Sequence, residues 1–260
     1  MILYKYVDSE TAKLIINNST LKFSKPSSFN DPFELSCLHY GTKSDHNEQA
    51  IKLIAASMSY GILSLTRNPL NPLMWAHYAK GEKVDGEPWI SLDQGNGSHA
   101  GFVFGIDVDE AGLNTDGCNI IPAKYGSVIY ASTRPKTPFS NSENNRFFEG
   151  MQFNYNSDLL EVFQRTFLYK PAYWSYEEEV RIVRNVGRRD SEIQEIPSSS
   201  FKEVYIGIRN ASNSIYLTKI KNELKRSLPN CEIYVCGFDK SEWSFNKNPI
   251  DDIIKKLTAE

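Results

Sequence analysis

The segment WSYEEEVRIV, residues 174–183, combines the composition of a β-strand with three consecutive glutamates. Glutamate is depleted in strands, whereas tyrosine, valine and isoleucine are enriched there. Because side chains alternate between the two faces of an extended chain, one face carries Glu177, Glu179 and Arg181. This face is either exposed to solvent, with a weak local ion pair, or the floor of a polar cleft. Taken alone, the pattern favours the exposed face.

The composition limits the classes of function. The chain has 260 residues, of which 40% are hydrophobic, and a formal net charge of −3. It has enough apolar residues for a large core but no overall positive field for nucleic acid or an anionic membrane. No Cys-x-x-Cys pair occurs, so we expect core cysteines rather than a zinc site. Without a signal-peptide pattern or an apolar run of membrane-spanning length, the sequence predicts a soluble, cytoplasmic protein.

Hydrophobic periodicity predicts the order of the secondary-structure elements. Besides 174–183, strands are predicted at residues 2–7, 20–24, 61–66, 100–108, 125–131, 201–208 and 231–238. Helices are predicted at residues 8–18, 46–58, 71–79, 146–169 and 212–227. Strands and helices alternate irregularly, so we expect one α+β domain over residues 1–245, with a mixed sheet flanked by helices. Residues 80–98 are expected to form an inserted loop, and residues 246–260 a C-terminal tail or short helix.

Two further segments could contribute to a site beside the acidic strand. In FSKPSSFNDPFE, residues 23–34, Asn30 and Asp31 favour a turn, and Phe29 and Phe33 offer stacking faces for a pocket. The alternative for this segment is a well-packed turn, which is the reading favoured by the segment alone. In MWAHYA, residues 74–79, His77 either binds a phosphate or hydroxyl group or packs on an amphipathic helix.

Taken together, these motifs resemble a known family. The order Leu3-Tyr4-Lys5-Tyr6, FSKPSSFNDPFE, LSLT…NPLMWAHYA, HAGFVFGID and WSYEEEVRIV resembles a bacterial family called domain of unknown function 2971. The resemblance runs from about residue 3 to about residue 240, and such proteins are often encountered near phage-defence genes. In the family a His-x-Gly-Phe strand usually follows MWAHYA closely, whereas residues 80–98 intervene here.

The order of elements is also similar, more distantly, to the ADP-ribosyltransferase fold of DNA-targeting toxins. LSLTRNPLNPLMWAHY, residues 63–78, and EEEVRIV match two of its segments, whereas its first-strand histidine is replaced here by Tyr4-Lys5. This resemblance implies a split sheet, NAD as the substrate, and a nucleic-acid or protein acceptor in a defence or toxin system. It implies Glu179 as the catalytic residue, with Glu177 in support.

The same resemblance implies a set of NAD-binding residues and no metal. They are Tyr4, Lys5, Ser24, Asn30, Asp31, Trp75, His77, Tyr78 and Arg181. Tyr4, Trp75 and Tyr78 would surround the nicotinamide. Cleavage of the nicotinamide–ribose bond builds a cation that a neighbouring carboxylate stabilises.

Two other classes of function are open at this point. One is a metal-dependent nuclease, in which Asp31, Glu34, Glu177 and Glu179 gather around Mg²⁺. The other is a non-catalytic sensor or interaction module of a defence system, in which exposed aromatic residues mark the partner surface.

Overall fold

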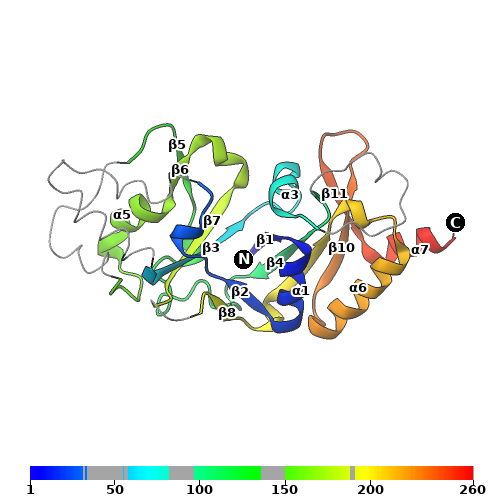
Figure 1. Ribbon diagram of the computed structural model, residues 1–260, viewed down its shortest axis with the longest axis horizontal. Helices are drawn as coiled ribbons and strands as arrows, with labels where there is room; N and C mark the ends of the chain where they lie inside the picture. The colour runs from blue at the N-terminus through cyan, green and yellow to red at the C-terminus, as the bar shows by residue number, and fades with distance from the viewer. Residues whose placement is uncertain are drawn as a thin grey trace. The chain divides into compact units, whose positions relative to one another are not determined.

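The fold is described by a computed structural model (Figure 1). It describes residues 1–31, 33, 55, 58–81, 97–135, 150–187 and 191–259. Most of the predicted helix 46–58, most of the predicted loop 80–98, and Glu34 lie outside the described residues. The chain divides into two compact units. The first unit comprises Met1–Thr20, Leu65–Ala111 and Glu195–Glu260, and the second comprises Leu21–Ser64 and Gly112–Gln194.

The predicted α+β class, with a mixed sheet flanked by helices, is confirmed. The largest sheet in the described part of the chain contains β1 (Ile2–Val7), β3 (Tyr60–Thr66), β4 (Phe102–Asp107), β7 (Glu179–Asn185), β9 (Phe201–Ile206), β10 (Glu232–Phe238) and β11 (Phe245–Pro249). Their order is β11-β10-β9-β4-β1-β3-β7. β1 pairs antiparallel with β4, whereas β9 pairs parallel with β10, so the sheet is mixed.

In the described part of the first unit, four helices accompany the strands: α1 (Ser9–Asn18), α3 (Pro72–Tyr78), α6 (Ser214–Ser227) and α7 (Ile250–Ala259). α6 connects the parallel strands β9 and β10, as a parallel pair requires a crossover. Its apolar side buries Leu217, Ile220 and Leu224. None of the described helices has the length and apolar character needed to cross a bilayer.

The helix starts follow from local capping. The Asp8 side chain accepts a hydrogen bond of 2.6 Å from the Thr11 backbone N–H at the start of α1. Asn71 caps α3 in the same way through the Leu73 N–H, at 3.0 Å, and Pro72 occupies the first turn. Residues 246–260, predicted as a C-terminal tail or short helix, contain most of β11 and all of α7.

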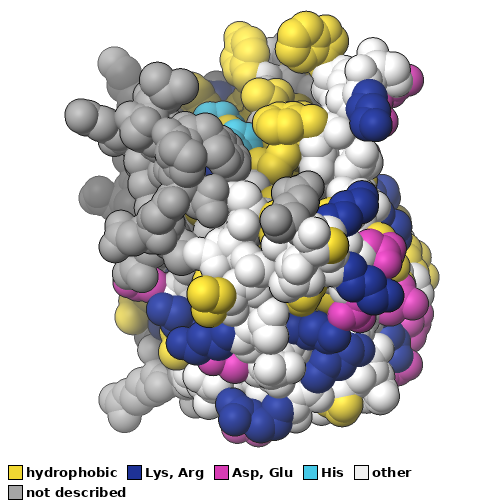
Figure 2. Space-filling view, turned by 90° about the vertical axis from the view of Figure 1, so that its right-hand side faces the viewer, with side chains coloured by type: hydrophobic (Ala, Val, Ile, Leu, Met, Phe, Trp, Pro, Cys, Tyr) yellow, Lys and Arg dark blue, Asp and Glu magenta, His cyan; other side chains and the backbone are white. Residues whose placement is uncertain are grey.

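One side of the molecule shows how polar and apolar surface are distributed. In Figure 2, basic and acidic side chains are interspersed over the lower part of the view, and hydrophobic side chains gather at its top. Among the most exposed hydrophobic residues are Phe238 and Trp243, at relative exposures of 69% and 104%. Both belong to the connection from β10 to β11 or its edge.

In its described part, the second unit contains β7, most of β3, the short strands β5 and β6, and most of β2 and β8. β2 (Thr20–Lys22) pairs with β8 (Ile193–Glu195), and β5 (Ile129–Ala131) runs parallel to β6 (Tyr169–Pro171). α5 (Leu160–Phe163) continues as a π-helix over Gln164–Leu168. A cluster of buried hydrophobic residues forms a core of the second unit. Its members are Tyr60, Ile62, Ile120, Ile121, Val162, Phe163, Phe167, Leu168 and Val183. Short 3₁₀ helices lie in this unit at Pro26–Ser28, Ala123–Tyr125, Ser157–Leu159 and Ala172–Glu177, and in the first unit at Ser198–Ser200 and Ile208–Asn210.

Four sequence predictions need correction. The strand predicted at 174–183 begins only at Glu179, and the strand predicted at 125–131 is limited to Ile129–Ala131. Of the described part of the predicted helix 146–169, continuous α- and π-helix covers 160–168. Cys118 is exposed rather than in the core, unlike Cys231 and Cys236.

Candidate functional site

The acidic strand is buried on both faces, so the exposed face favoured by its sequence pattern is wrong. Val180 and Ile182 have relative exposures of 0%, Glu179 of 5% and Arg181 of 1%. One edge of β7 pairs with β3, and the residues around Ser127 form a bridge to Val180. The backbone of β7 is therefore hydrogen-bonded inside the second unit, and its charged side chains point inward.

A sharp bend separates Glu177 from Glu179. Residues Ala172–Glu177 form a 3₁₀ helix, and Glu178 adopts a left-handed conformation with φ 46° and ψ 42°. Such a conformation is uncommon for a residue with a Cβ atom. The bend brings both flanking carboxylates to Lys170 of β6. The Lys170 Nζ atom donates to Glu177 Oε2 at 2.5 Å and to Glu179 Oε2 at 3.2 Å.

Arg181 holds Glu179 from the other side. Its Nε donates to Glu179 Oε1 at 2.9 Å and its Nη2 to Glu179 Oε2 at 3.2 Å, which is a bidentate pair. Its Nη1 donates to the backbone oxygen of Phe167, near the end of the π-helix, at 2.7 Å. The guanidinium carbon lies 5.6 Å from the centre of the Phe29 ring, so Arg181 lies over one face of that ring.

These four residues, Lys170, Glu177, Glu179 and Arg181, form a buried charge quartet. Their relative exposures are 9%, 4%, 5% and 1%, and their two positive and two negative charges balance. Buried charges persist in proteins only when they are paired and hydrogen-bonded. The quartet meets this condition through the contacts described above.

The charge of Glu179 is fixed by its surroundings. Burial by itself raises the pKa of this carboxyl group, but the cations of Arg181 and Lys170 and the hydrogen bonds from Arg181 and Ser64 outweigh burial. Together they lower the pKa to about 2. Glu179 is consequently ionised throughout the physiological pH range. Hydrogen bonds with three neighbouring side chains, Arg181, Lys170 and Ser64, fix the orientation of its carboxylate.

Three residues that contact Glu179 are not among the site residues predicted from the sequence. Lys170 and Ser64 contact Glu179 as described, and the Glu179 backbone N–H donates to the Tyr130 hydroxyl oxygen at 2.9 Å. Burial is the main cause that raises the pKa of Tyr130, so its hydroxyl stays neutral. A signal existed for Ser64, because it is the single polar side chain inside the apolar run GILSL. A lone polar residue in a buried strand needs a partner.

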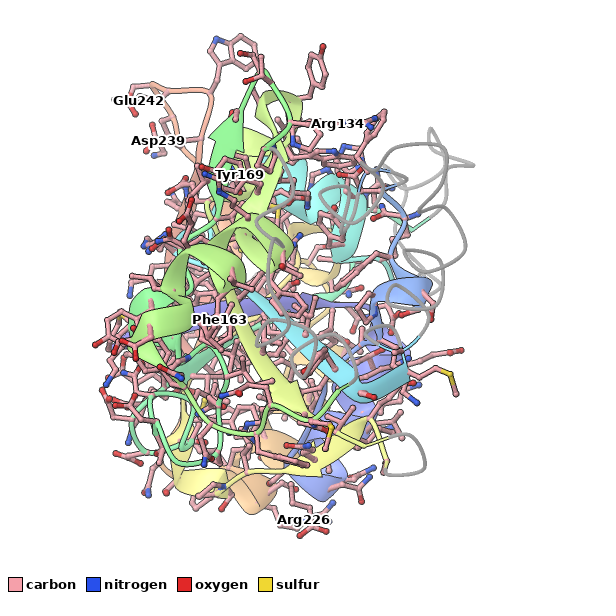
Figure 3. All side chains as sticks on the ribbon, turned by 90° about the vertical axis from the view of Figure 1, so that its left-hand side faces the viewer. Arg134, Phe163, Tyr169, Arg226, Asp239 and Glu242 are labelled. Atoms are coloured by element: carbon pink, nitrogen blue, oxygen red, sulfur yellow. The ribbon has the colours of Figure 1, made fainter. Side chains whose placement is uncertain are left out.

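A pocket adjoins the quartet at Lys170. It has a volume of about 170 Å³ and is lined by Phe33, Ala131, Ser132, Thr133, Arg134, Pro135, Tyr169, Lys170, Pro171 and Tyr173. The guanidinium carbon of Arg134 lies 4.5 Å from the centre of the Phe33 ring. Arg134 and Tyr169 are labelled in the upper part of Figure 3, and both line this pocket. The pocket therefore combines two cationic side chains with three aromatic rings.

The predicted binding residues of the second unit have different settings. Ser24 forms a backbone bridge with Ile62, and Asn30 is exposed. Asp31 has a relative exposure of 5%, and its Oδ1 accepts from the Phe33 N–H at 2.9 Å. Asp31 thus accepts a hydrogen bond from the backbone two residues later, as is typical of the turn that the sequence favours here.

The remaining predicted residues belong to the first unit. The Tyr4 hydroxyl donates to Glu203 Oε2 at 3.0 Å, and Lys5 follows it on β1 in a half-buried position. His77 is exposed, and its ring centre lies 6.2 Å from that of Tyr78. Their convergence with residues of the second unit on one cavity stays a prediction.

Trp75, also in the first unit, has a packing role. Its relative exposure is 0%, and its indole N–H donates to the Pro69 carbonyl at 2.9 Å. Its ring meets Tyr6 edge-to-face, with ring centres 5.5 Å apart. The nicotinamide-stacking role implied by the resemblance conflicts with this burial, because the ring has no uncovered face.

The described residues contain no group of three or more His, Cys, Asp or Glu side chains that could hold a metal ion. The carboxylates of Glu177 and Glu179 already have Lys170 and Arg181 as counterions. Glu34, which the nuclease hypothesis also needs, lies outside the described residues. The quartet by itself therefore offers little to a divalent cation.

Comparison with known proteins adds one match. The model of a family described as "Protein of unknown function (DUF2971)" matches residues 74–182. The matched stretch includes the MWAHYA and HAGFVFGID segments and all four residues of the charge quartet. No curated protein and no solved structure matches the chain.

Proposed function

We propose that the protein is an NAD-consuming enzyme, either an ADP-ribosyltransferase or an NAD glycohydrolase, and that it acts in a bacterial phage-defence or toxin system. Glu179 is its key carboxylate, and Glu177 supports it. The observation that carries the proposal is the setting of Glu179, which is a buried carboxylate, ionised at physiological pH and oriented by Arg181, Lys170 and Ser64.

A fixed negative charge suits this reaction. When the bond between nicotinamide and ribose breaks, nicotinamide leaves with the bonding electron pair and the ribose becomes cationic. A preoriented anion beside the ribose stabilises that cation without having to rearrange. A general acid or base works best when its pKa lies near the working pH, and the pKa of Glu179, about 2, is far below it. Glu179 is therefore suited to cation stabilisation rather than proton transfer.

Lys170 links this charge to the pocket. It contacts both carboxylates of the quartet and also lines the pocket. A ligand phosphate that binds Lys170 draws its positive charge away from Glu177 and Glu179, so Arg181 alone faces two carboxylates. The site then carries a net negative charge while the substrate is bound. Water, or a nucleophile of a nucleic-acid or protein acceptor, then forms a bond to the cationic ribose carbon. The attacking group loses a proton in this step.

The test is turnover of labelled NAD by the wild type and by Glu179→Gln. We expect Glu179→Gln to lower turnover about 100-fold or more, as loss of one preorganised electrostatic group does in other enzymes. Glu178→Gln is the matched control, because Glu178 is the exposed neighbour in the same run of glutamates. Turnover by Glu179→Gln equal to that of Glu178→Gln, with both proteins folded, would remove the assignment.

A second candidate is a non-catalytic interaction module, and the exposure of Phe238 and Trp243 favours it. In that case the quartet is a structural feature of the core. Folded wild-type protein that cleaves no NAD, but loses a binding partner on Trp243→Ala, would support this candidate.

A further inference from the structure

We infer that the pocket beside Lys170 binds a phosphate group together with one aromatic ring of a nucleotide. The inference deepens the proposed function and rests on it only in taking NAD as the natural nucleotide. It names the ligand chemistry of a surface that includes Arg134 and Tyr173, to which neither the sequence nor the family match gives a role.

The charged groups of the pocket are suited to phosphate. Arg134 and Lys170 both line it, and none of the lining residues that the structure describes is acidic. A guanidinium group matches the geometry of phosphate oxygens, and a lysine ammonium adds a compact positive charge. The side chain of Lys170, with an exposure of 8%, already has Glu177 and Glu179 as counterions, so we expect Arg134 to provide most of the attraction for phosphate.

The aromatic groups add a second recognition element. Phe33 and Tyr173 line the pocket with relative exposures of 44% and 89%, so parts of their rings are open to a ligand. Exposed aromatic rings stack on nucleobases and similar planar rings. Arg134 already lies over Phe33 at 4.5 Å, which places a cation and a ring side by side, as a phosphorylated ring compound needs.

The size of the pocket limits how much of the ligand enters it. Its volume is about 170 Å³. Sites that enclose whole drug-sized ligands have volumes of roughly 300–1,000 Å³. The pocket is therefore suited to a phosphate and one ring of a nucleotide, and we expect the rest of a mononucleotide to lie outside it.

Because Lys170 lies close to Trp174, the fluorescence of Trp174 can report on ligand binding. The Lys170 Nζ atom lies 5.0 Å from the centre of the Trp174 ring and within hydrogen-bond range of Glu177 and Glu179. A phosphate that attracts the ammonium group changes the electric field at the indole. Binding should therefore change the fluorescence of Trp174, and Trp174→Phe should remove that part of the signal.

The experiment compares ligands that contain both a phosphate and an aromatic ring with ligands that contain only one of these groups. ADP, AMP, adenosine and inorganic pyrophosphate are titrated into the full chain by calorimetry and by tryptophan fluorescence. We expect ADP to bind at least about tenfold more tightly than adenosine, because adenosine lacks the charged groups. Pyrophosphate should also bind more weakly than ADP, because it lacks the ring.

The matched pair of variants is Arg134→Met and Lys124→Met. Lys124 is an exposed cation of the same unit, paired with Asp116 at 2.9 Å, and it does not line the pocket. Arg134→Met should weaken ADP binding about tenfold or more, whereas Lys124→Met should leave it within about twofold. Equal weakening by both variants, or no binding of ADP and pyrophosphate, would overturn the pocket assignment.

The same measurements separate this inference from the proposed function. ADP has no nicotinamide bond to break, so its affinity reports on the pocket alone. ADP binding that depends on Arg134, with no cleavage of NAD, supports the pocket and contradicts the enzyme. Cleavage of NAD that is unchanged in Arg134→Met, with no ADP binding, contradicts the pocket and supports the enzyme.

Discussion

Glu179 and Glu203 are both strand glutamates with several partners, yet they lie in different surroundings. Glu179 of the second unit faces the cations of Arg181 and Lys170 within 3.2 Å. Glu203, on β9 of the first unit, accepts hydrogen bonds from two neutral phenols, Tyr4 at 3.0 Å and Tyr205 at 2.8 Å. Its nearest cation, the Nζ of Lys247, is 3.7 Å from its Oε1 atom.

The two arrangements balance charge differently. The side chain of Glu179 has an exposure of 6%, and the opposite charges of the quartet cancel around it. The side chain of Glu203 has an exposure of 14%, and its negative charge acts on its phenol neighbours. Burial, followed by the charge of Glu203, raises the pKa of Tyr4 to about 12. A carboxylate that is paired with cations can thus stay ionised when it is deeply buried. A carboxylate that accepts hydrogen bonds from phenols instead raises the pKa of those phenols.

The largest expected difference between the two regions is in stability after loss of the carboxylate. Glu179→Gln leaves Arg181, with 1% exposure, without its bidentate anion, and we expect the free energy of unfolding to fall by about 3–5 kcal/mol. Glu203→Gln should lower it by only about 1 kcal/mol, because Lys247, with a side-chain exposure of 44%, is solvated and the amide still accepts hydrogen bonds. Urea denaturation at pH 7 measures both values. Equal losses would mean that the two clusters do not differ as described.

The second difference is in the direction of pH dependence. The folded-state pKa of Glu179 is lowered from 4.5 to about 2, so its contribution is complete above pH 4.5 and is lost as pH falls through about 2. The shift corresponds to roughly 3 kcal/mol. The folded-state pKa of Tyr4 is raised from 10.0 to about 12, so its contribution is complete below pH 10 and is lost as pH rises through about 12.

Unfolding of variants at different pH values separates these contributions. Glu179→Gln should flatten the acidic side of the stability profile and Tyr4→Phe the alkaline side, each relative to the wild type. A Glu179→Gln protein whose stability falls as steeply as that of the wild type between pH 4.5 and pH 2 would contradict the lowered pKa.

The smallest expected difference concerns the backbone beside each glutamate. Glu178, between the two carboxylates of the quartet, has a φ of 46°, and glycine adopts this conformation without steric cost. Glu178→Gly should therefore raise the free energy of unfolding by about 1 kcal/mol. Lys202, next to Glu203, lies at a register shift between β9 and β4 but has no positive φ. It should respond in the opposite sense, with Lys202→Gly lowering the free energy of unfolding by about 1 kcal/mol. Thermal unfolding of the pair measures the sign, and the same sign for both would contradict the strained bend.

Periodicity and capping were sufficient for much of the fold. The predicted strand at 2–7 coincides with β1, and the helices predicted at 8–18 and 71–79 correspond to α1 and α3, which Asp8 and Asn71 cap. The bend at Glu178 could not be predicted, because a left-handed glutamate is held by contacts of its neighbours with Lys170, which lies outside the acidic motif. The intrinsic preferences of the residues around Glu178 alone predict an extended chain at this position.

The site was predicted in part for the same reason. The run of glutamates indicated Glu177, Glu179 and Arg181, and the structure brings these three together. The pattern did not decide whether they face solvent, because a strand buried on both faces loses the alternation that marks an exposed side. Lys170 was missed since it follows the π-helix in a separate strand, and its role depends on how β6 lies beside the bend.

The members of the quartet are close neighbours along the chain. Lys170 precedes Glu177 by seven positions and Glu179 by nine, and Arg181 follows Glu179 by two. Closing loops of this length costs little chain entropy and takes about 10–100 ns. During folding these charges can therefore meet before strands that are distant in sequence assemble around them. The growing core then encloses a nearly neutral cluster instead of four separate ions, which lowers the kinetic barrier that buried charges would otherwise impose.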